Sequence, residues 1–504
     1  MAIRFSLQAG RAGRTIREYQ DAIIYRTKLT HELIKSFSKK SADYKPSENS
    51  WILDEIEKLE TGLESLTKTI KHQFPEYAEL ISREPLSLED TQALLGPKEG
   101  LITFIRNFQG NQTHIFIVRR GESKAYTIDL GEDQLKEMVS KLRRGLAPSQ
   151  DGIAPFDAKL AHDLYRQLLG PAESMLADIK HLFVVPDASL ESLPFHLLVT
   201  EDPGNEPLPG VGAQPQRGFT TTSDDDQALP KTDGRYQDIA WLAKQYAITT
   251  LPSVSSLRAL RVFAKKGQAS EPFIGFGDPV LGSESGKTKG LQVASFFRGA
   301  VANVDQVRQL ARLPETEVEL KAMARYLGAD DSSIYLRERA TETQVKSLPL
   351  NQKRVVAFST HGLISGELKG LAEPALVLTP PDKGTPEDDG LLTASEVAQL
   401  KLNADWVILS ACNTAAADTP GARGLSGLAK AFFYAGARAL LVSHWPVESN
   451  AATTLTSRMF DALKKNPTLG RAEALRQSMM TLANNPNTAH PFFWAPFVVV
   501  GEGG

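Results

Sequence analysis

The stretch Trp406-Val-Ile-Leu-Ser410-Ala411-Cys412-Asn413-Thr414-Ala415 is apolar and β-branched at first and then ends in small polar residues. This pattern is typical of a buried strand in a parallel sheet, with Cys412 just beyond its carboxyl end. A second stretch of the same kind, Arg354-Val-Val-Ala-Phe-Ser359-Thr360, ends in His361-Gly362. In open α/β sheets the functional crevice lies at the carboxyl ends of the strands. If the two strands are neighbours, we expect an imidazole and a thiol to face one cleft.

The types and spacing of these two residues suit catalysis by a thiolate. His361 precedes Cys412 by 412 − 361 = 51 residues, and caspase-type cysteine proteases place the histidine about 50 residues before the nucleophile. A thiol needs a base or a cation beside it to become a nucleophile. His361 can take that proton and later protonate the leaving amine, and the N–H groups of Gly362 and Cys412 are candidate oxyanion donors. The alternative is that a lone cysteine at a strand end is a small buried hydrophobic residue.

Composition narrows the class of protein. The 504 residues are 41% hydrophobic and 23% charged, with a formal net charge of −3, which is ordinary for a globular chain and gives no drive toward nucleic acid or anionic membrane. One cysteine excludes an intrachain disulfide and fits a reducing cytoplasm. We see no signal peptide, no apolar run long enough to span a membrane and no clustered histidines. The expectation is a cytoplasmic protein without a metal or another cofactor.

Three regions follow one another along the chain. Residues 1–75 are predicted to form a helical hairpin arm, because the apolar residues Ile52, Ile56, Leu59, Leu63, Leu66 and Ile70 repeat at intervals of three and four. We expect the turn at residues 45–50, with Ser50 as the N-cap of the second helix. Residues 76–265 are predicted to form an α/β domain that begins with a three-stranded meander. Its Pro-, Gly- and Asp-rich stretch 203–235 predicts a mobile insertion.

Residues 266–504 are predicted to form a second α/β unit. Strand patterns at 272–277, 333–336, 354–360, 406–410 and 439–443 alternate with helical patterns near 315–327, 341–346, 394–400, 423–436 and 448–465. Such alternation favours a mostly parallel sheet with helices on both faces. The predicted fold class is therefore α/β, with the smaller helical arm at the amino end.

At this point the sequence resembles the CHAT family of caspase-like proteins, which are often joined to tetratricopeptide repeats. The resemblance rests on Ser359-Thr360-His361-Gly362 and on Ser410-Ala411-Cys412-Asn413-Thr414-Ala415. Further blocks agree and extend it from about Phe74 to the carboxyl end, namely 183–195, 246–258, 432–438, 443–447 and 491–497. Two features depart from the pattern of many members, which have an acidic residue at the position of Asn413 and Gly-Glu within the stretch 421–424.

The resemblance implies a cysteine endopeptidase of the caspase, separase and gingipain clan with a His361–Cys412 dyad. It also implies a pseudo-protease-like half, here 76–265, before the catalytic half. By analogy with caspases, Asp278 would line the pocket for the substrate residue before the cut and would favour Arg or Lys there; as an alternative, Asp278 shapes a turn before Pro279. Ser410, Ser443, His444 and Trp445 are the other candidate substrate-binding residues, although Trp445 is equally suited to the core.

The family further suggests a protein substrate, including a dedicated bacterial partner, an activator protein or repeat module, and a role in antiviral defence. Two other functions stay open: a catalytically silent scaffold or binding module, and a thiol hydrolase or acyltransferase that acts on a non-peptide substrate. His444 also ends a strand and competes for the role of base, but a histidine followed by Trp-Pro suits a wall of the cleft better, so we prefer His361.

Overall fold

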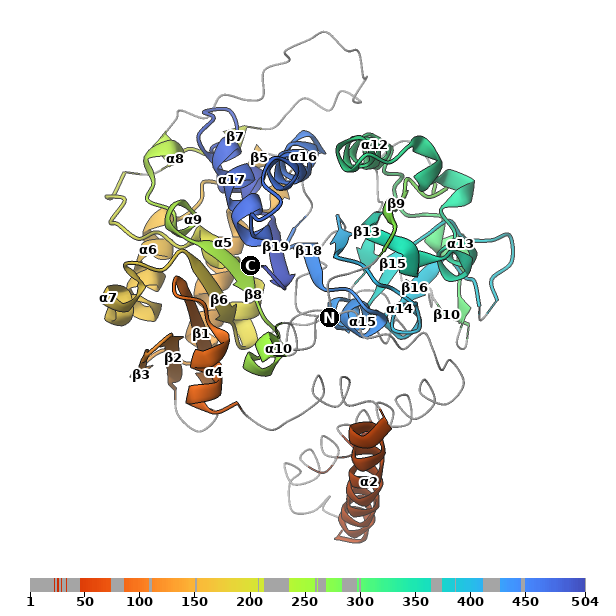
Figure 1. Cartoon of the computed structure of the whole chain (residues 1–504), viewed down its shortest axis with the longest axis horizontal. Helices are drawn as coiled ribbons and strands as arrows, with labels where there is room; N and C mark the ends of the chain where they lie inside the picture. The colour runs from red at the N-terminus through yellow and green to blue at the C-terminus, as the bar shows by residue number, and fades with distance from the viewer. Residues whose placement is uncertain are drawn as a thin grey trace. The chain divides into compact units, whose positions relative to one another are not determined.

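The computed structural model describes residues 22, 25, 26, 29, 33, 46–73, 86–107, 111–149, 152–206, 208–212, 235–258, 261, 269–282, 297–298, 301–363, 374–385, 387–410, 427–445 and 449–503. The chain divides into two compact units, with a boundary between Pro85 and Leu86. The first unit holds the predicted helical arm, and the second holds both predicted α/β halves (Figure 1).

The amino-terminal unit contains the long helix α2 (Pro46–Gln73). Ile52 and Leu63 of the predicted apolar seam are buried, as is Leu29 of the preceding helical segment. Arg26 of that segment lies 3.9 Å from Glu60 of α2, so the two segments contact each other as a hairpin would. The prediction that α2 starts after an N-cap at Ser50 is wrong, because the helix already begins at Pro46, and proline is well suited to the first turn of a helix.

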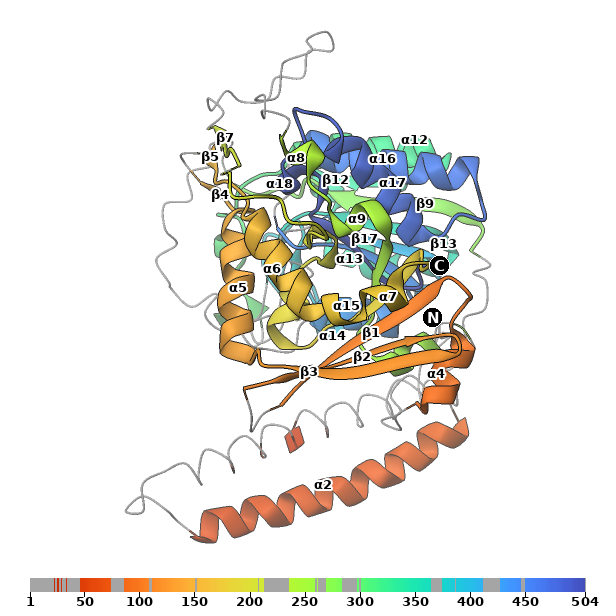
Figure 2. The same ribbon diagram turned by 90° about the vertical axis from the view of Figure 1, so that its left-hand side faces the viewer.

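One sheet of eleven strands forms the centre of the second unit (Figures 1 and 2). Seven of its ten strand pairings are parallel, and the antiparallel ones are β18–β19, β1–β2 and β2–β3. In sheet order the strands are β12 (Ile334–Leu336), β9 (Glu271–Gly277), β13 (Lys353–Ser359), β17 (Trp406–Leu409), β18 (Ala439–Ser443), β19 (Phe497–Gly501), β8 (Ala247–Thr250), β6 (His181–Val185), β1 (Glu99–Arg106), β2 (Thr113–Arg119) and β3 (Glu122–Ile128).

Strand β19 joins the two predicted α/β halves. It runs antiparallel to β18 of the carboxyl-terminal half and parallel to β8 of the amino-terminal half. The predicted boundary near residue 266 is therefore no break in the sheet, and residues 86–504 form one compact unit. Most of the predicted insertion 203–235 lies outside the described residues.

Helices cover both faces of the sheet. Alternate strand residues point to opposite sides, and both sets are apolar here, so each face packs against helices. Ala357, Ile408 and Leu441 belong to the core that includes α12 and α16, whereas Val356 and Val407 face the core that includes α14 and α15. The helices are α4 (Leu88–Leu94), α5 (Glu132–Arg144), α6 (Ala158–Leu168), α7 (Glu173–Leu176), α8 (Arg235–Asp238), α9 (Leu242–Gln245), α10 (Val254–Arg258), α11 (Val304–Val307), α12 (Glu315–Leu327), α13 (Glu342–Ser347), α14 (Ala394–Val397), α15 (Gly427–Ala435), α16 (Ser449–Lys465), α17 (Arg471–Ala483) and α18 (Pro491–Trp494). The predicted fold class is confirmed.

In the part of the chain that the structure describes, three small sheets lie outside the large one. Strands β14 (Gly362–Leu363), β15 (Ala375–Val377) and β16 (Leu391–Thr393) form the sheet that matters for the candidate site, because it begins one residue after His361. The other two consist of β4 (Pro148–Ser149), β5 (Gly152–Ile153) and β7 (Val211–Gly212), and of β10 (Phe297–Arg298) and β11 (Val301–Ala302). Within the described residues, no helix combines the length and apolarity needed to cross a bilayer.

Candidate active site

The two strands that lead to the candidate dyad lie side by side. Strands β13 and β17 pair in parallel, with Phe358 opposite Leu409, and the Ser410 N–H donates to the Phe358 carbonyl at 3.0 Å. His361 follows the end of β13 by two residues, and Cys412 follows Ser410 by two residues. The prediction of neighbouring strands is confirmed. Cys412 itself lies outside the described residues, so its distance from the imidazole stays untested.

The small sheet holds the backbone of the candidate base. The Val377 N–H donates to the His361 carbonyl at 2.9 Å, and the Thr360 hydroxyl donates to the Val377 carbonyl at 2.6 Å. Because Thr360 is buried, its hydroxyl bond is shielded from competing water. These two bonds fix the direction in which the chain leaves β13, and with it the place of the half-buried His361 side chain.

The ring of His361 is oriented by a backbone carbonyl. Its Nε2 lies 2.7 Å from the Ala311 carbonyl oxygen. A carbonyl only accepts hydrogen bonds, so Nε2 carries the hydrogen and Nδ1 of the neutral ring keeps its lone pair. This tautomer leaves Nδ1 as the atom that can take a proton from a thiol. A general base is typically held in place by a third group, and the Ala311 carbonyl serves His361 in that way.

Gly362 occupies a position in the ladder that leaves its amide free of β15. In an antiparallel ladder, residues that exchange hydrogen bonds alternate with residues that do not. His361 accepts from Val377, and the next pair is Gly362 opposite Leu376. The Gly362 N–H therefore points away from β15, as an oxyanion donor would have to. Its role, like that of the Cys412 N–H, stays a prediction.

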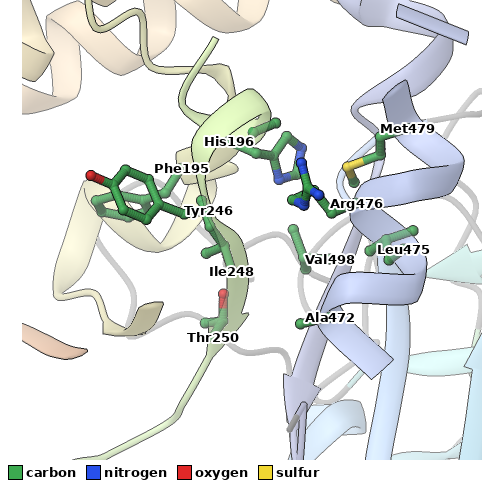
Figure 3. Close-up of a pocket in the computed structure, with 11 residues that line it drawn as sticks. Phe195, His196, Tyr246, Ile248, Thr250, Ala472, Leu475, Arg476, Met479 and Val498 are labelled. Carbon is green, nitrogen blue, oxygen red and sulfur yellow. The ribbon is translucent and has the colours of Figure 1, made fainter. Parts of the chain in front are cut away.

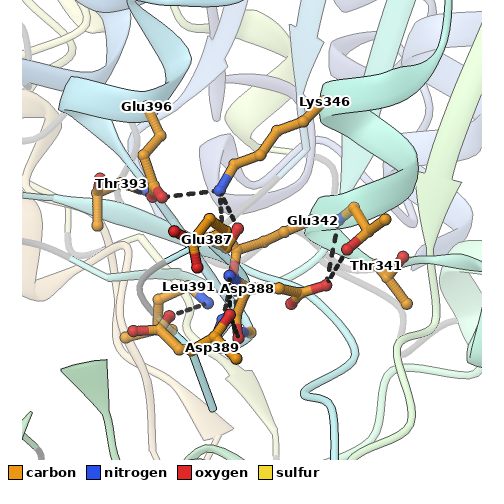
Figure 4. Close-up of polar contacts among 12 residues, drawn as sticks. Thr341, Glu342, Lys346, Glu387, Asp388, Asp389, Leu391, Thr393 and Glu396 are labelled. Atoms are coloured by element: carbon orange, nitrogen blue, oxygen red, sulfur yellow. Dashed lines mark hydrogen bonds and ion pairs between the residues drawn. The ribbon is translucent and has the colours of Figure 1, made fainter.

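A polar network links α13 and α14 to the β14–β15–β16 sheet at β16, the strand of this sheet that does not follow His361 directly (Figure 4). Glu342 accepts from the Lys346 ammonium at 2.8 Å and from the N–H groups of Asp389 and Gly390 at 2.7 and 2.8 Å. Lys346 also lies 2.8 Å from Glu396 of α14. Burial raises the pKa of Glu342 to about 7 and the like charge of Glu396 adds to that rise, whereas the Lys346 ammonium and the Asp389 N–H oppose it because they favour the charged form. The network ties α13 and α14 to the turn that precedes β16.

Asp278, the predicted selector of a basic substrate residue, is fully buried and already paired. Its carboxylate accepts from Nε and Nη2 of Arg312 at 3.1 and 3.0 Å, and Nη2 of Arg337 lies 3.3 Å away. Asp278 and Arg337 both adopt positive φ angles, 42° and 51°, which are strained for residues with a side chain. The predicted role in substrate selection is untested, but it would require a substrate side chain to displace Arg312.

The other predicted substrate-binding residues differ in exposure. Ser410 is half-buried, whereas Ser443, His444 and Trp445 are almost completely buried. The Trp445 indole N–H donates to the Phe492 carbonyl and its ring belongs to the core, so its alternative as a core residue is the one observed. Burial removes the surface with which Ser443 and His444 would contact a substrate in this conformation.

His444 is also a poor rival to His361 as the base. Burial lowers its pKa well below the ordinary value, and the neighbouring Arg143 and His196 lower it further. Both neighbours belong to the amino-terminal half, and Arg143 donates to the His444 carbonyl at 2.8 Å. The ring thus stands at the junction of the two halves, among groups that oppose its protonation.

Sequence reasoning missed Glu319. This residue lies on the buried face of α12 together with Thr316, Leu320 and Met323, and only 5% of its surface is exposed. Its carboxyl is close enough to the hydroxyls of Ser410 and Ser359 for both to lower its pKa, although burial dominates and raises that pKa to about 7. The sequence feature that could have pointed to Glu319 is its position as an acidic residue within the apolar face of an amphipathic helix.

Two hollows in the described residues lie away from this site. A cavity of about 10 Å³, room for about one water molecule, lies between β8 and α17 and is lined by His196, Tyr246 and Arg476 among others (Figure 3). A groove of about 1010 Å³ lies at the opposite edge of the sheet, against Val355 at the start of β13 and Trp406 at the start of β17. Neither includes His361. No cluster of metal-binding side chains occurs among the described residues.

Comparison with known proteins identifies the family. The model of the CHAT domain matches residues 158–502, which is more than half of the chain. The chain belongs to the CHAT family. This CHAT match includes β6 and β8 of the amino-terminal half as well as β13 and β17, which precede His361 and Cys412 in the sequence, in agreement with the single continuous sheet.

Two curated relatives of this CHAT protein are the mouse and human forms of tetratricopeptide repeat protein 28. They are 29% and 28% identical over 224 residues, which is 38% of this chain. That match spans only 9% and 8% of the relatives' own length.

Two solved structures that match parts of the chain at low identity are the following. A separase–securin complex of Saccharomyces cerevisiae has a TM-score of 0.42 and 12% identity, covering 96% of this chain and 38% of the other. The Arg-specific cysteine proteinase gingipain R has a TM-score of 0.35 and 11% identity, covering 74% of each chain.

Proposed function

We propose that this protein is a cysteine endopeptidase in which His361 is the general base and Cys412 the nucleophile. One observation carries the proposal: the parallel pairing of β13 and β17 brings Ser410 beside Phe358, so that His361 and Cys412 each follow the same edge of the sheet by a few residues. Membership of a family with a caspase-like fold supports it. The ring orientation of His361 supports it further, since Nδ1 remains available as an acceptor.

The geometry around His361 suggests the course of the reaction. His361 Nδ1 takes the thiol proton, and the Cys412 thiolate attacks the substrate carbonyl carbon while the Gly362 N–H stabilises the developing oxyanion. The imidazolium then gives its proton to the leaving amine as the peptide bond breaks and an acyl-enzyme forms. Water, deprotonated by His361, hydrolyses the thioester and restores the free thiol.

A preference for Arg or Lys before the cut remains part of the proposal, with Asp278 as the acidic partner. Asp278 is paired with Arg312, so an Arg or Lys side chain of the substrate would have to replace the Arg312 guanidinium on the Asp278 carboxylate. Such an exchange is one way in which activity would be regulated. The substrate is proposed to be a protein, and the activator a partner or repeat module, as the repeat proteins among the relatives suggest. A cytoplasmic location and a part in bacterial antiviral defence belong to the same proposal.

The decisive experiment labels the single cysteine of the chain. We expect a peptidyl electrophile with Arg at its first position to add one mass equivalent to the protein, and Cys412→Ala and His361→Ala to abolish that addition. His114→Ala is the matched control, since that histidine lies on β2, far along the sheet from β13. Labelling that persists in His361→Ala would refute the dyad.

The same experiment separates the two other candidate functions. No labelling in the presence or absence of candidate partners would favour a scaffold or binding module. Labelling by acyl esters without cleavage of any peptide would favour a thiol hydrolase or acyltransferase.

A further inference from the structure

The groove of about 1010 Å³ lies at the edge of the large sheet opposite the candidate active site. The strands β9, β13 and β17 start beside it, where Pro272, Val355 and Trp406 line it. The ends of α12 and α16 and the start of α17 contribute the rest of the lining, together with residues next to β18 and β19. Pockets for small ligands usually measure about 300–1,000 Å³, so this groove has room for a ligand larger than most small molecules.

Five charged side chains form a row along this groove, with an arginine at each end. Arg354 pairs with Asp405 at 3.4 Å, and Asp405 lies 3.9 Å from Arg438. Glu502 lies 3.3 Å from Arg438 and 3.6 Å from Arg471. Backbone hydrogen bonds between the strand ends set this order, since the Asp405 N–H donates to the Arg354 carbonyl at 2.8 Å. In the same way, the Glu502 N–H donates to the Arg438 carbonyl at 3.2 Å. Three guanidinium groups therefore share two carboxylates.

The lining carries an excess of positive charge. Lys464, in the last turn of α16, is exposed and lines the same groove, so four cations face two carboxylates there. The side chain of Arg354 is 60% exposed. Burial lowers the pKa of Arg471 and the nearby Arg438 lowers it further, against the effect of Glu502. The Arg471 Nε is also buried without a partner among the described residues. An anion in the groove would meet cations that the two carboxylates leave unmatched.

The length of the row suits an extended peptide better than a compact anion. The row crosses the ends of four neighbouring strands, β13, β17, β18 and β19, which is about 14 Å at about 4.8 Å per strand. An extended chain covers that length in about four residues, at about 3.3 Å per residue. A single phosphate or carboxylate cannot contact both ends of the row.

The apolar part of the lining favours a peptide over a nucleic acid. Tyr326 is exposed, and Leu463 and Leu469 are half-buried beside the charged row. In an extended chain alternate side chains point to opposite sides, so one side can present carboxylates and the other apolar groups. A phosphate backbone has no apolar groups to place there, and the carboxylates of Asp405 and Glu502 would repel it.

We propose that this groove is a docking site for an extended acidic peptide segment of a partner protein, whose carboxylates meet Arg354 and Lys464 and, at the other end of the row, Arg471. Apolar side chains of the same segment pack on Leu463 and Leu469. The inference goes beyond the proposed function and does not rest on it, because the groove lies at the opposite edge of the sheet from His361.

The test measures binding of a fluorescein-labelled peptide, Glu-Leu-Ser-Leu-Glu-Leu-Ser-Leu-Glu, to the full chain by fluorescence anisotropy at low salt. This peptide should bind about tenfold more tightly than the same peptide with glutamine in place of glutamate, and added salt should reduce the difference. The double variant Arg354→Gln and Lys464→Gln should weaken binding about fivefold, the scale expected of two exposed ion pairs.

A matched control removes the same charge outside the groove. Arg325→Gln and Lys465→Gln together remove two exposed cations of α12 and α16 that do not line it, so binding should change less than about twofold. Thermal melts followed by circular dichroism check that both double variants are folded.

Each other outcome overturns the proposal. Equal binding of the glutamate and glutamine peptides, equal losses in the two double variants, or no binding at all would remove the acidic peptide from this groove. Tighter binding of a labelled uridine ten-mer that is lost in the groove variant would assign the groove to nucleic acid. Displacement of the peptide by inorganic phosphate, beyond the effect of sodium chloride at the same ionic strength, would assign it to a small anion. His361→Ala should bind the peptide as the wild type does, so this result stands or falls separately from the proposed peptidase activity.

Discussion

The unusual carboxyl of Glu319 makes a quantitative prediction about stability. Its pKa rises from the ordinary 4.5 to about 7 in the folded protein, chiefly through burial. Replacing it with glutamine removes this titration and preserves the size of the side chain. The shift of about 2.5 pH units, at about 1.4 kcal/mol per unit, corresponds to about 3.4 kcal/mol of folding free energy. Since only 5% of the residue is exposed, solvent screening reduces this figure little.

The sign of the effect follows from proton binding. Because the folded pKa is the higher one, the folded state holds the proton more tightly than the unfolded chain does. The stabilisation by the neutral acid is fully present below pH 4.5 and is lost as the pH rises through about 7. Between pH 5 and pH 8 the wild type should therefore lose about 2.5 kcal/mol that Glu319→Gln keeps.

The assay is urea unfolding of the wild type and of Glu319→Gln at pH 5 and pH 8. We expect the difference in free energy of unfolding between the two proteins to grow in favour of the variant by about 2.5 kcal/mol between these pH values. The same comparison with Glu317→Gln should show a change below about 0.5 kcal/mol, because Glu317 is partly exposed. A Glu319 difference that stays constant with pH would refute the raised pKa and the reasoning from burial.

Three further predictions follow from contacts around the candidate site. Arg312→Ala should remove the two-bond partner of Asp278, leaving Arg337 at 3.3 Å, and should speed labelling by an Arg electrophile several-fold. The added change Asp278→Ala should cancel that gain, and equal rates in all three proteins would remove Asp278 from substrate selection. Thr360→Val should lower the free energy of unfolding, measured in urea, by about 1–3 kcal/mol, because it leaves the buried Val377 carbonyl without the Thr360 hydroxyl as its donor. The same variant should slow labelling of the cysteine, and an unaltered labelling rate would show that the position of His361 does not depend on this bond. Gly436→Ala should lower the melting temperature by several degrees, because Gly436 has φ 115° and a Cβ there would meet a backbone carbonyl; an unchanged melting temperature would contradict that backbone conformation.

Local pattern predicted much of the secondary structure. The helix predicted near 315–327 is observed as α12 over the same residues, since apolar periodicity and turn residues specify such elements without reference to the rest of the chain. The placement of His361 just after a buried strand came from the same kind of pattern. By contrast, the start of α2 was misjudged, because several polar residues before Ser50 continue the helix instead of ending it.

Contacts between side chains far apart in the sequence could not be predicted from local sequence patterns. No spacing along the chain indicated that Arg312 would pair with the Asp278 carboxylate or that the Asp278 N–H would donate to the Thr316 hydroxyl. These contacts exist because α12 packs across the ends of β9 and β13, and the direction of a helix on a sheet depends on how many side chains fit together at once.

The amino-acid sequence by itself determined which segments become strands and helices, the family of the protein, and the two residue types fit for thiolate chemistry. Only the tertiary structure decided that β13 lies beside β17, that β19 joins both halves in one sheet, and that Asp278 is neutralised by arginines. The physical reason is that period and turn chemistry act over a few residues, whereas strand order and the pairing of buried charges are settled by close packing and desolvation among residues far apart in the chain.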